Sequence, residues 1–174
     1  MKPTAFLALS ALACGIAQAA AAPDPALVRQ GEYLARAGDC VACHTARDGK
    51  PFAGGLPMET PIGAVYSTNI TPDRKTGIGD YSFEDFDRAV RHGVARSGDT
   101  LYPAMPYTAY AKITDEDMRA LYAWFLEGGV QAVAQPNQDS DIAWPLNMRW
   151  PLAIWNLLFH DDTVYQDNPK QSPT

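Results

Sequence analysis

The sequence predicts an all-α domain with three main helices joined by large loops. Three segments begin with helix-start signals and continue with apolar residues at helical spacing. The 174 residues are 47% apolar and 20% charged, which is the composition of one ordinary globular domain. A fibre, a coiled coil and a mainly disordered chain are therefore excluded.

The first two helices are expected to begin near residues 24 and 82. Asp24 and Pro25 supply a cap and a first-turn proline. The residues that follow at helical spacing are Leu27, Val28, Gly31, Leu34 and Ala35. Ser82 is expected to cap the second helix. Its predicted apolar stripe consists of Phe83, Phe86, Val90 and Val94.

The third helix is expected to open at Thr114, with Asp117 three residues further on, and to stop at Gly128 and Gly129. Its predicted buried face consists of Met118, Leu121, Tyr122 and Phe125. Residues 45–80, by contrast, carry many Gly, Pro, Thr and Asp residues and predict a long irregular loop. A loop of this length in so small a domain suggests that it wraps something other than protein.

Residues 1–19 are predicted to be a secretory signal peptide and not part of the fold. An apolar stretch over residues 6–17 leads to the small-residue cleavage site Ala17-Gln18-Ala19. The stretch is shorter than the roughly 20 residues that cross a bilayer, and no later segment reaches that length without charge or proline. Cys14 is interpreted as an apolar filler, since the residues before it match a lipoprotein acylation sequence poorly. In a bacterium, the mature chain would work in the periplasm.

The charge balance argues against a nucleic-acid partner. Lys and Arg total 14 and Asp and Glu total 20, which gives a formal net charge of -6. Nucleic-acid binding normally demands a basic surface. Three cysteines are also too few to staple a fold with disulfides, so the core must come from burial or from a cofactor.

Residues 40–44 read Cys-Val-Ala-Cys-His, a C-x-x-C-H motif. This spacing puts both sulfurs on one helical turn, where each can form a thioether to haem, and puts His44 under the iron as proximal ligand. A zinc site would need about four ligands, and no second pair exists. A thioredoxin-like pair needs a βαβ unit, and a structural disulfide would not need His44. The motif therefore predicts one covalent haem c on Cys40 and Cys43.

The sixth iron ligand is not fixed by spacing. The candidates beyond the signal are Met58, Met105, Met118, Met148, His92 and His160. Met118 is expected in a helix core, and His92 is expected on a helix surface. Met105 is favoured because Pro103 and Pro106 restrict its backbone, so that little entropy is lost when its thioether is held at iron. A Met/His pair raises the reduction potential and closes the iron to small ligands.

Other polar residues are candidates for supporting roles around the haem. The carbonyl of Pro51 is a weak candidate to accept a hydrogen bond from the second ring nitrogen of His44. The candidates for hydrogen bonds to the propionates are Tyr66, Ser67, Asn69 and Arg91. Each of these four is explained equally well as loop structure or helix surface.

Residues 133–174 are predicted to be an aromatic extension of a domain that covers residues 20–132. Its apolar residues are Trp144, Leu146, Trp150, Leu152, Ile154, Trp155, Leu157, Leu158 and Phe159. Pro145, Arg149 and Pro151 interrupt this stretch, which excludes a membrane-spanning helix. Two interpretations stay open: the extension packs on its own domain, or it docks to a dehydrogenase or a further haem domain.

Several short motifs together resemble one known family. They are Gly31-Glu32-Tyr33-Leu34, Gly38-Asp39-Cys40, Cys43-His44-Thr45, Phe52-Ala53-Gly54-Gly55, Tyr66-Ser67-Thr68-Asn69-Ile70-Thr71-Pro72 and Leu101-Tyr102-Pro103-Ala104-Met105-Pro106. The set resembles the first haem domain of the cytochrome c subunit of bacterial membrane-bound alcohol and sugar dehydrogenases. The resemblance implies a class I cytochrome c fold, with haem attached at Cys40 and Cys43. It also implies His44 and Met105 as the axial ligands.

In that family, electrons leave a quinoprotein or flavoprotein dehydrogenase, cross the haems and reach membrane ubiquinone. The family subunit usually carries three C-x-x-C-H motifs, whereas this sequence has one. Two interpretations stay open, a relative with a single haem or a truncated subunit with three. We therefore expect an electron carrier and not an enzyme, with such a dehydrogenase as donor and a further cytochrome or quinone-reducing subunit as acceptor. It is expected at the outer face of the inner membrane, associated peripherally through its partners. The alternatives are a gas sensor or peroxidase-like enzyme with an open sixth site, and a structural subunit.

Overall fold

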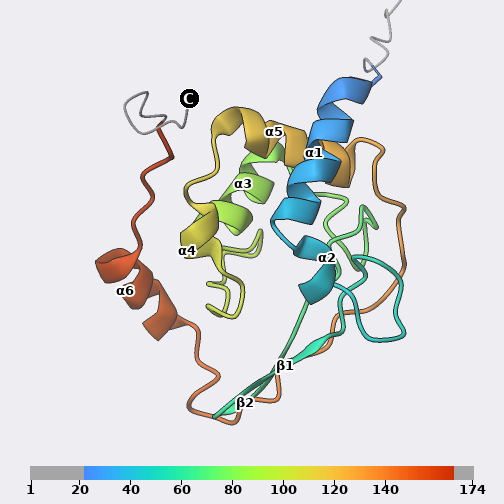
Figure 1. Cartoon of the computed structure of the whole chain (residues 1–174). Coiled ribbons are helices and arrows are strands. Elements are labelled where there is room, and N and C mark those ends of the chain that lie inside the picture. Colours follow the sequence, from blue (N-terminus) through green and yellow to red (C-terminus); the bar gives the residue numbers. More distant parts are fainter. Residues whose placement is uncertain (1–21, 167–174) are drawn as a thin grey trace, which may run out of the picture.

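The computed structural model describes residues 22–166, and the three expected helices form its scaffold (Figure 1). They are α1 (Pro25–Ala37), α3 (Phe83–His92) and α5 (Asp115–Leu126). A further helix, α2 (Cys40–Cys43), is the single turn that the motif spacing predicted, whereas α4 (Tyr107–Tyr110) and α6 (Trp150–Phe159) were not expected. The mainly helical architecture confirms the predicted fold class. The expected signal peptide, with Cys14, lies outside the described residues, as do residues 167–174.

The helices begin where their capping residues predict. The Asp24 carboxylate accepts a hydrogen bond from the Ala26 N–H at 2.8 Å at the start of α1. Ser82 and Asp85 form a reciprocal capping box at the start of α3. Thr114 accepts from the Asp117 N–H at 3.2 Å at the start of α5. Each cap satisfies backbone donors that the first turn of a helix leaves without partners.

Helices α1 and α5 pack backbone against backbone at Gly31. A Cβ atom on residue 31 would lie 1.9 Å from the Ala120 carbonyl oxygen, so only glycine allows this approach. Buried residues of this scaffold form one cluster: Ala35, Ile78, Phe86, Met118, Leu121 and Phe125. Of the predicted buried face of the third helix, Met118, Leu121 and Phe125 are buried, and Tyr122 is half-buried against the cluster. Met118 is fully buried. The Phe52 ring packs edge-on against Phe125 with centroids 5.3 Å apart, which ties the long loop to α5.

Two details of the sequence prediction were wrong. The loop expected over residues 45–80 contains an antiparallel hairpin of β1 (Pro57–Thr60) and β2 (Gly63–Tyr66). These strands have only four residues each and begin with proline and glycine, so their pattern is too short to stand out. The stripe on α3 also stops short of Val94, because the helix ends at His92 and Gly93 caps it.

The chain after α5 runs back across the domain before it reaches α6. The Asp141 N–H donates to the Ala64 carbonyl of β2 at 2.8 Å, and Ile142 is buried. The chain then turns outward, and α6 lies beside α4 at the edge of the molecule (Figure 1). Among the described residues, every helix is too short or too polar to cross a bilayer.

Candidate functional site

The C-x-x-C-H motif lies on a single helical turn, as predicted. Cys40 and Cys43 form the two ends of α2, and the His44 N–H donates to the Cys40 carbonyl at 3.0 Å. Both cysteines are free thiols. Burial raises the pKa of the Cys40 thiol to about 11, so this thiol stays protonated at neutral pH.

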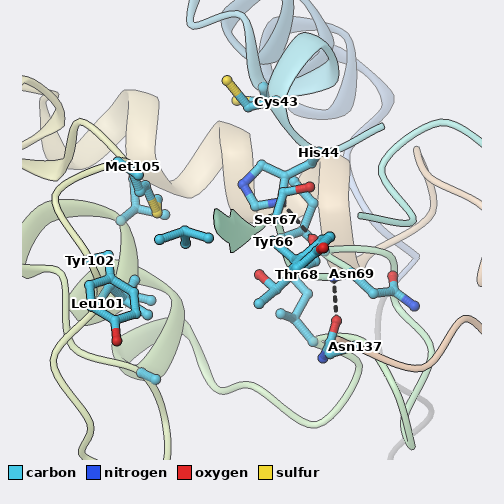
Figure 2. Close-up of a pocket in the computed structure, with 18 of the residues that line it drawn as sticks. Cys43, His44, Tyr66, Ser67, Thr68, Asn69, Leu101, Tyr102, Met105 and Asn137 are labelled. Atoms are coloured by element: carbon cyan, nitrogen blue, oxygen red, sulfur yellow. Dashed lines mark hydrogen bonds between the residues drawn. The ribbon is translucent and has the colours of Figure 1, made fainter. Parts of the chain in front are cut away.

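Both cysteines and His44 line a cavity of about 360 Å³. Its apolar walls include Phe86, Leu121 and Phe125 of the core cluster. The remaining walls come from the loop after β2, from the segment before α4 and from the chain after α5. Figure 2 shows side chains from these separate elements turned toward one shared space. The long loop therefore wraps a cavity, as its length suggested.

The ring of His44 is held by the backbone of the long loop. Its Nδ1 lies 2.6 Å from the Thr68 carbonyl oxygen, and an oxygen there can only accept, so Nδ1 carries the proton. Burial lowers the pKa of His44, which keeps the ring neutral and leaves Nε2 with a free lone pair. The expectation that Pro51 would supply this carbonyl was wrong. The true acceptor lies 24 residues along the chain, a separation that no local pattern reveals.

Gly54 brings the two loop segments that hold His44 together. Its N–H donates to the His44 carbonyl at 2.8 Å. Its φ is 73°, and a Cβ atom there would lie 2.5 Å from the carbonyl carbon of Thr68. Only glycine fits both the backbone conformation and this space. The same residue thus fixes the chain just after the motif and the carbonyl that orients the ring.

Met105 reaches the cavity from the segment before α4, on the other side of the cavity from His44 (Figure 2). Its N–H donates to the Tyr102 carbonyl at 3.1 Å, and its carbonyl accepts from the Tyr107 N–H at 2.8 Å. The loop that carries Met105 is therefore tied down on both sides. Among the six sixth-ligand candidates, Met58 of β1 also lines the cavity.

The other four sixth-ligand candidates lie elsewhere. Met118 is fully buried in the core cluster, as expected, and Met148 is exposed. The rings of His92 and His160 pack edge-on against each other with centroids 5.7 Å apart. None of these four side chains lines the cavity.

The predicted polar residues divide into two groups. Tyr66, Ser67 and Asn69 line the cavity. Arg91 does not, because it is buried in ion pairs with Asp87 at 2.9 Å and Asp115 at 2.8 Å. A carboxylate four residues before Arg91 on the same helix was a sequence signal for that pairing.

Arg149 is a cavity residue that the sequence reasoning treated only as an interruption of the apolar stretch. It lines the cavity beside Tyr102, with its guanidinium 3.9 Å from the centre of that ring. It also donates to the Thr100 carbonyl at 2.9 Å. A sequence signal for this role existed, because Arg149 is the only Lys or Arg in residues 120–169.

The Cytochrome c family model matches residues 28–128 of the sequence, which is more than half of the chain. The chain belongs to the cytochrome c family. Membership of this family implies covalently bound haem c, and it confirms the resemblance on which the class I fold was predicted.

This cytochrome is similar to subunits of several dehydrogenases. It is 66% identical over 151 residues to the gluconate 2-dehydrogenase cytochrome c subunit of Pantoea cypripedii, which covers 86% of this chain and 34% of the relative. It is 52% identical over 158 residues to the cytochrome c subunit of alcohol dehydrogenase (quinone) of Gluconobacter oxydans, covering 91% and 33%. A diheme cytochrome c-type of Cereibacter sphaeroides is 36% identical over 134 residues, covering 74% and 45%. The chain spans about a third of the length of the first two relatives.

The cavity residues of this cytochrome fit a covalent haem c. Two thiols stand on one helical turn, a neutral imidazole presents a free Nε2, and a thioether and apolar walls complete the cavity. Within residues 22–166, no group of three or more His, Cys, Asp or Glu side chains is placed to hold a metal ion. The described part of the chain also has only the two-stranded sheet, which lacks the βαβ unit of a thioredoxin-like redox pair.

Asn69 connects this cavity wall to the chain after α5. Its side-chain amide donates to the Val133 carbonyl at 2.8 Å and to the Gln135 carbonyl at 3.1 Å. Its own N–H donates to the Asn137 side chain at 2.7 Å (Figure 2). The Asn69 side-chain oxygen accepts twice from Thr71. Asn69 is thus fully engaged in holding the loop next to Thr68, and its amide has no donor left for a propionate.

Proposed function

We propose that this chain is a cytochrome c with a single haem that relays electrons from a dehydrogenase, and that it transforms no substrate itself. The proposed donor is a quinoprotein or flavoprotein dehydrogenase for an alcohol or a sugar. The proposed acceptor is a further cytochrome or a quinone-reducing subunit. The observation that carries this proposal is the pairing of His44 and Met105 across one cavity (Figure 2), which Cys40 and Cys43 also line.

Four side chains would hold the haem. Cys40 and Cys43 would form the thioethers, and His44 Nε2 and the Met105 sulfur would be the axial ligands. When bound, the haem supplies a one-electron iron couple, and Met/His ligation raises its reduction potential. The Thr68 carbonyl fixes the His44 tautomer and increases the basicity of Nε2. The apolar walls would keep water away from the bound haem and so strengthen the effect of any charge near it.

Arg149 is proposed as the cation that faces the haem propionates. Among the described residues it has no carboxylate within ion-pair distance, whereas Arg91 has two. Stacking on Tyr102 and the bond to Thr100 hold its guanidinium in place. A fixed cation beside the cavity favours the reduced haem, because reduction adds one negative charge.

The relatives support the choice of donor. Several of them are named as cytochrome subunits of gluconate, alcohol (quinone) or fructose dehydrogenases, which is the class of donor proposed here. The predicted signal peptide supports a periplasmic location, at the outer face of the inner membrane. Peripheral membrane association would come through the partners.

Absorption spectra and the mass of protein expressed in a periplasm test this proposal. The protein should show a c-type spectrum, gain the mass of one haem, and ignore CO when reduced. Met105→Ala should abolish the weak red sulfur-to-iron band of the oxidised protein and admit CO. Met58→Ala is the matched control, since this methionine also lines the cavity.

Rapid CO binding by the wild type would contradict the proposal and support an open sixth site. Loss of the red band in Met58→Ala instead of Met105→Ala would reassign the ligand. A haem-loaded protein that no dehydrogenase reduces would contradict the relay and leave a structural role.

A further inference from the structure

The stretch from Trp144 to Phe159 exposes an unusual amount of apolar surface. Nine of the fourteen exposed large apolar side chains among the described residues lie in it. We call these nine residues the C-terminal strip: Trp144, Leu146, Met148, Trp150, Ile154, Trp155, Leu157, Leu158 and Phe159. Leu157 is 84% exposed and Trp144 is 78% exposed. So much exposed apolar surface on one stretch of the chain marks an interaction site.

Helix α6 is attached to the domain by its one polar side chain. Asn156 accepts a hydrogen bond from the Tyr107 hydroxyl at 2.8 Å and faces the His92 carbonyl, to which its amide donates at 3.3 Å. The other residues of α6 are apolar, and none of them is fully buried. The helix therefore turns its one hydrogen-bonding side chain toward the domain and exposes Leu157 and Leu158 to solvent. Each exposed Å² of apolar surface forgoes about 25 cal/mol of burial free energy.

The strip is continuous with the mouth of the haem cavity. Arg149 lines the cavity, and the next residue, Trp150, starts α6 and is exposed. Asn156 accepts a hydrogen bond from Tyr107, which lies two residues after Met105 in the chain. A partner seated on the strip would therefore lie near the segment that carries Met105.

We propose that the C-terminal strip is the docking surface for the electron-donor protein. The inference rests on the proposed function and adds to it the surface and the chemistry of the partner. That partner presents a central apolar patch edged by basic side chains.

The composition of the strip favours a protein over a lipid surface. Interface cores are enriched in Trp, Met and Arg and depleted in Lys and Glu, and residues 143–160 contain three Trp and no Lys or Glu. Helices that lie on membranes carry Lys and Arg on their polar face, whereas α6 has no charged residue. Asp161 and Asp162 follow it after His160 and would be repelled by anionic lipid.

Acidic residues border the strip at both ends. Asp139 and Asp141 precede it and Asp162 follows it, all three exposed and free of ion pairs within the described chain. The net charge of the whole sequence is -6. A basic rim on the donor would therefore steer association and place its apolar patch on the strip.

The test measures reduction of the haem-loaded protein by a defined donor in stopped flow. The probe is gluconate 2-dehydrogenase from Pantoea cypripedii, freed of its own cytochrome c subunit and reduced with gluconate. The double variant Leu157→Ser/Leu158→Ser should lower the second-order rate constant about tenfold or more, as expected for two central contacts. Its absorption spectrum and reduction potential should not change. The wild-type rate should fall as salt is added.

Tyr33→Ser is the matched control, because Tyr33 is 70% exposed on α1 and apolar but lies outside the strip. Its rate should equal that of the wild type. Equal rates for the wild type and the double variant would overturn the docking surface while leaving the relay intact. A wild type that the dehydrogenase never reduces would overturn the proposed donor and this inference together.

Two further measurements identify other occupants. Sedimentation with vesicles of phosphatidylglycerol and phosphatidylethanolamine that the double variant abolishes would assign the strip to a membrane. A wild-type dimer in analytical ultracentrifugation that the double variant converts to a monomer would assign it to a second copy of the chain. Either result would overturn a donor-docking role, and we expect neither.

Discussion

Helices α5 and α6 have similar lengths but opposite relations to the molecule. α5 opens with three acidic residues, yet Met118, Ala120 and Ala123 on its inner face are fully buried. α6 has no charged residue and is far more apolar, yet none of its residues is fully buried. Apolar residues in a helix indicate that some surface will bury them. Only their helical spacing, with polar residues on the opposite face, indicates that this surface belongs to the same chain. α5 shows both signals, whereas α6 shows only the first.

The largest expected effect comes from truncating one apolar side chain in each helix. Met118→Ala should lower the free energy of unfolding by about 2–5 kcal/mol, because it leaves a cavity in the core cluster. Leu157→Ala should change it by less than about 0.5 kcal/mol, since this side chain already faces solvent. Urea unfolding followed by circular dichroism measures both. Similar losses for the two variants would end the contrast between the helices.

Next in size is the buried amide that joins the haem-cavity loop to the chain leading to α6. Asn69→Ala should cost about 1–3 kcal/mol, because the Val133 and Gln135 carbonyls lose their donor. Asn137→Ala, at an exposed neighbour in the same network, should cost less. Urea midpoints for the two variants check the order. If Asn69→Ala is no more harmful than Asn137→Ala, the network does not hold the two regions together.

The loss of a charge at Arg149 should alter the haem and leave the fold unchanged. Arg149→Gln should lower the reduction potential, because it removes a cation that favours the reduced state. A shift of about 60 mV would correspond to a tenfold change in the one-electron equilibrium. Arg149→Lys keeps the charge, so its reduction potential should stay closer to that of the wild type. Arg96→Gln, at an exposed arginine that does not line the cavity, should have the reduction potential of the wild type. Spectroelectrochemical titration measures these reduction potentials. Equal potentials in Arg149→Gln and Arg96→Gln would refute the proposal that Arg149 favours the reduced haem.

The smallest effect is expected at the far end of α6, where Lys112 meets Asp161. A hydrogen bond from Lys112 and others from Thr163 lower the pKa of the Asp161 carboxyl. Because the folded pKa lies below the unfolded value of about 3.9, this contact stabilises the fold above that pH and is lost as the pH falls through the folded pKa. NMR titration should show the pKa of Asp161 rising toward its ordinary value in Lys112→Met. An unchanged pKa would show that Lys112 does not hold this carboxylate, and Lys50→Met serves as the control.

The sequence sufficed for features that depend on neighbours in the chain. Capping residues located the starts of α1, α3 and α5, and the motif spacing located both thiols on one turn. Cys40, Cys43, His44 and Met105 all line the cavity, although their roles as haem ligands remain predictions.

Features that depend on distant contacts could not be predicted. The partner of His44 is a backbone carbonyl, and any residue type at position 68 could supply it. Arg149 reaches the cavity only because the chain after α5 folds back across the domain. Asn69 looked like a propionate donor because a buried amide and a ligand-binding amide have the same sequence signature. Short strands such as β1 and β2 likewise depend on pairing rather than on pattern.

The clamp that Asn69 makes on Val133 and Gln135 has a practical consequence for dissecting this chain. These hydrogen bonds hold Asn69 in place, and Asn69 directly follows Thr68. The Thr68 carbonyl oxygen orients the ring of His44. A fragment that stops at residue 132 would discard both acceptors, so its colour and redox behaviour should differ from those of the intact chain. A fragment that runs to residue 142 would keep them and add the Asp141 bond to the hairpin. Resistance to protease cleavage between residues 132 and 142 therefore reports how firmly the His44 ring is held.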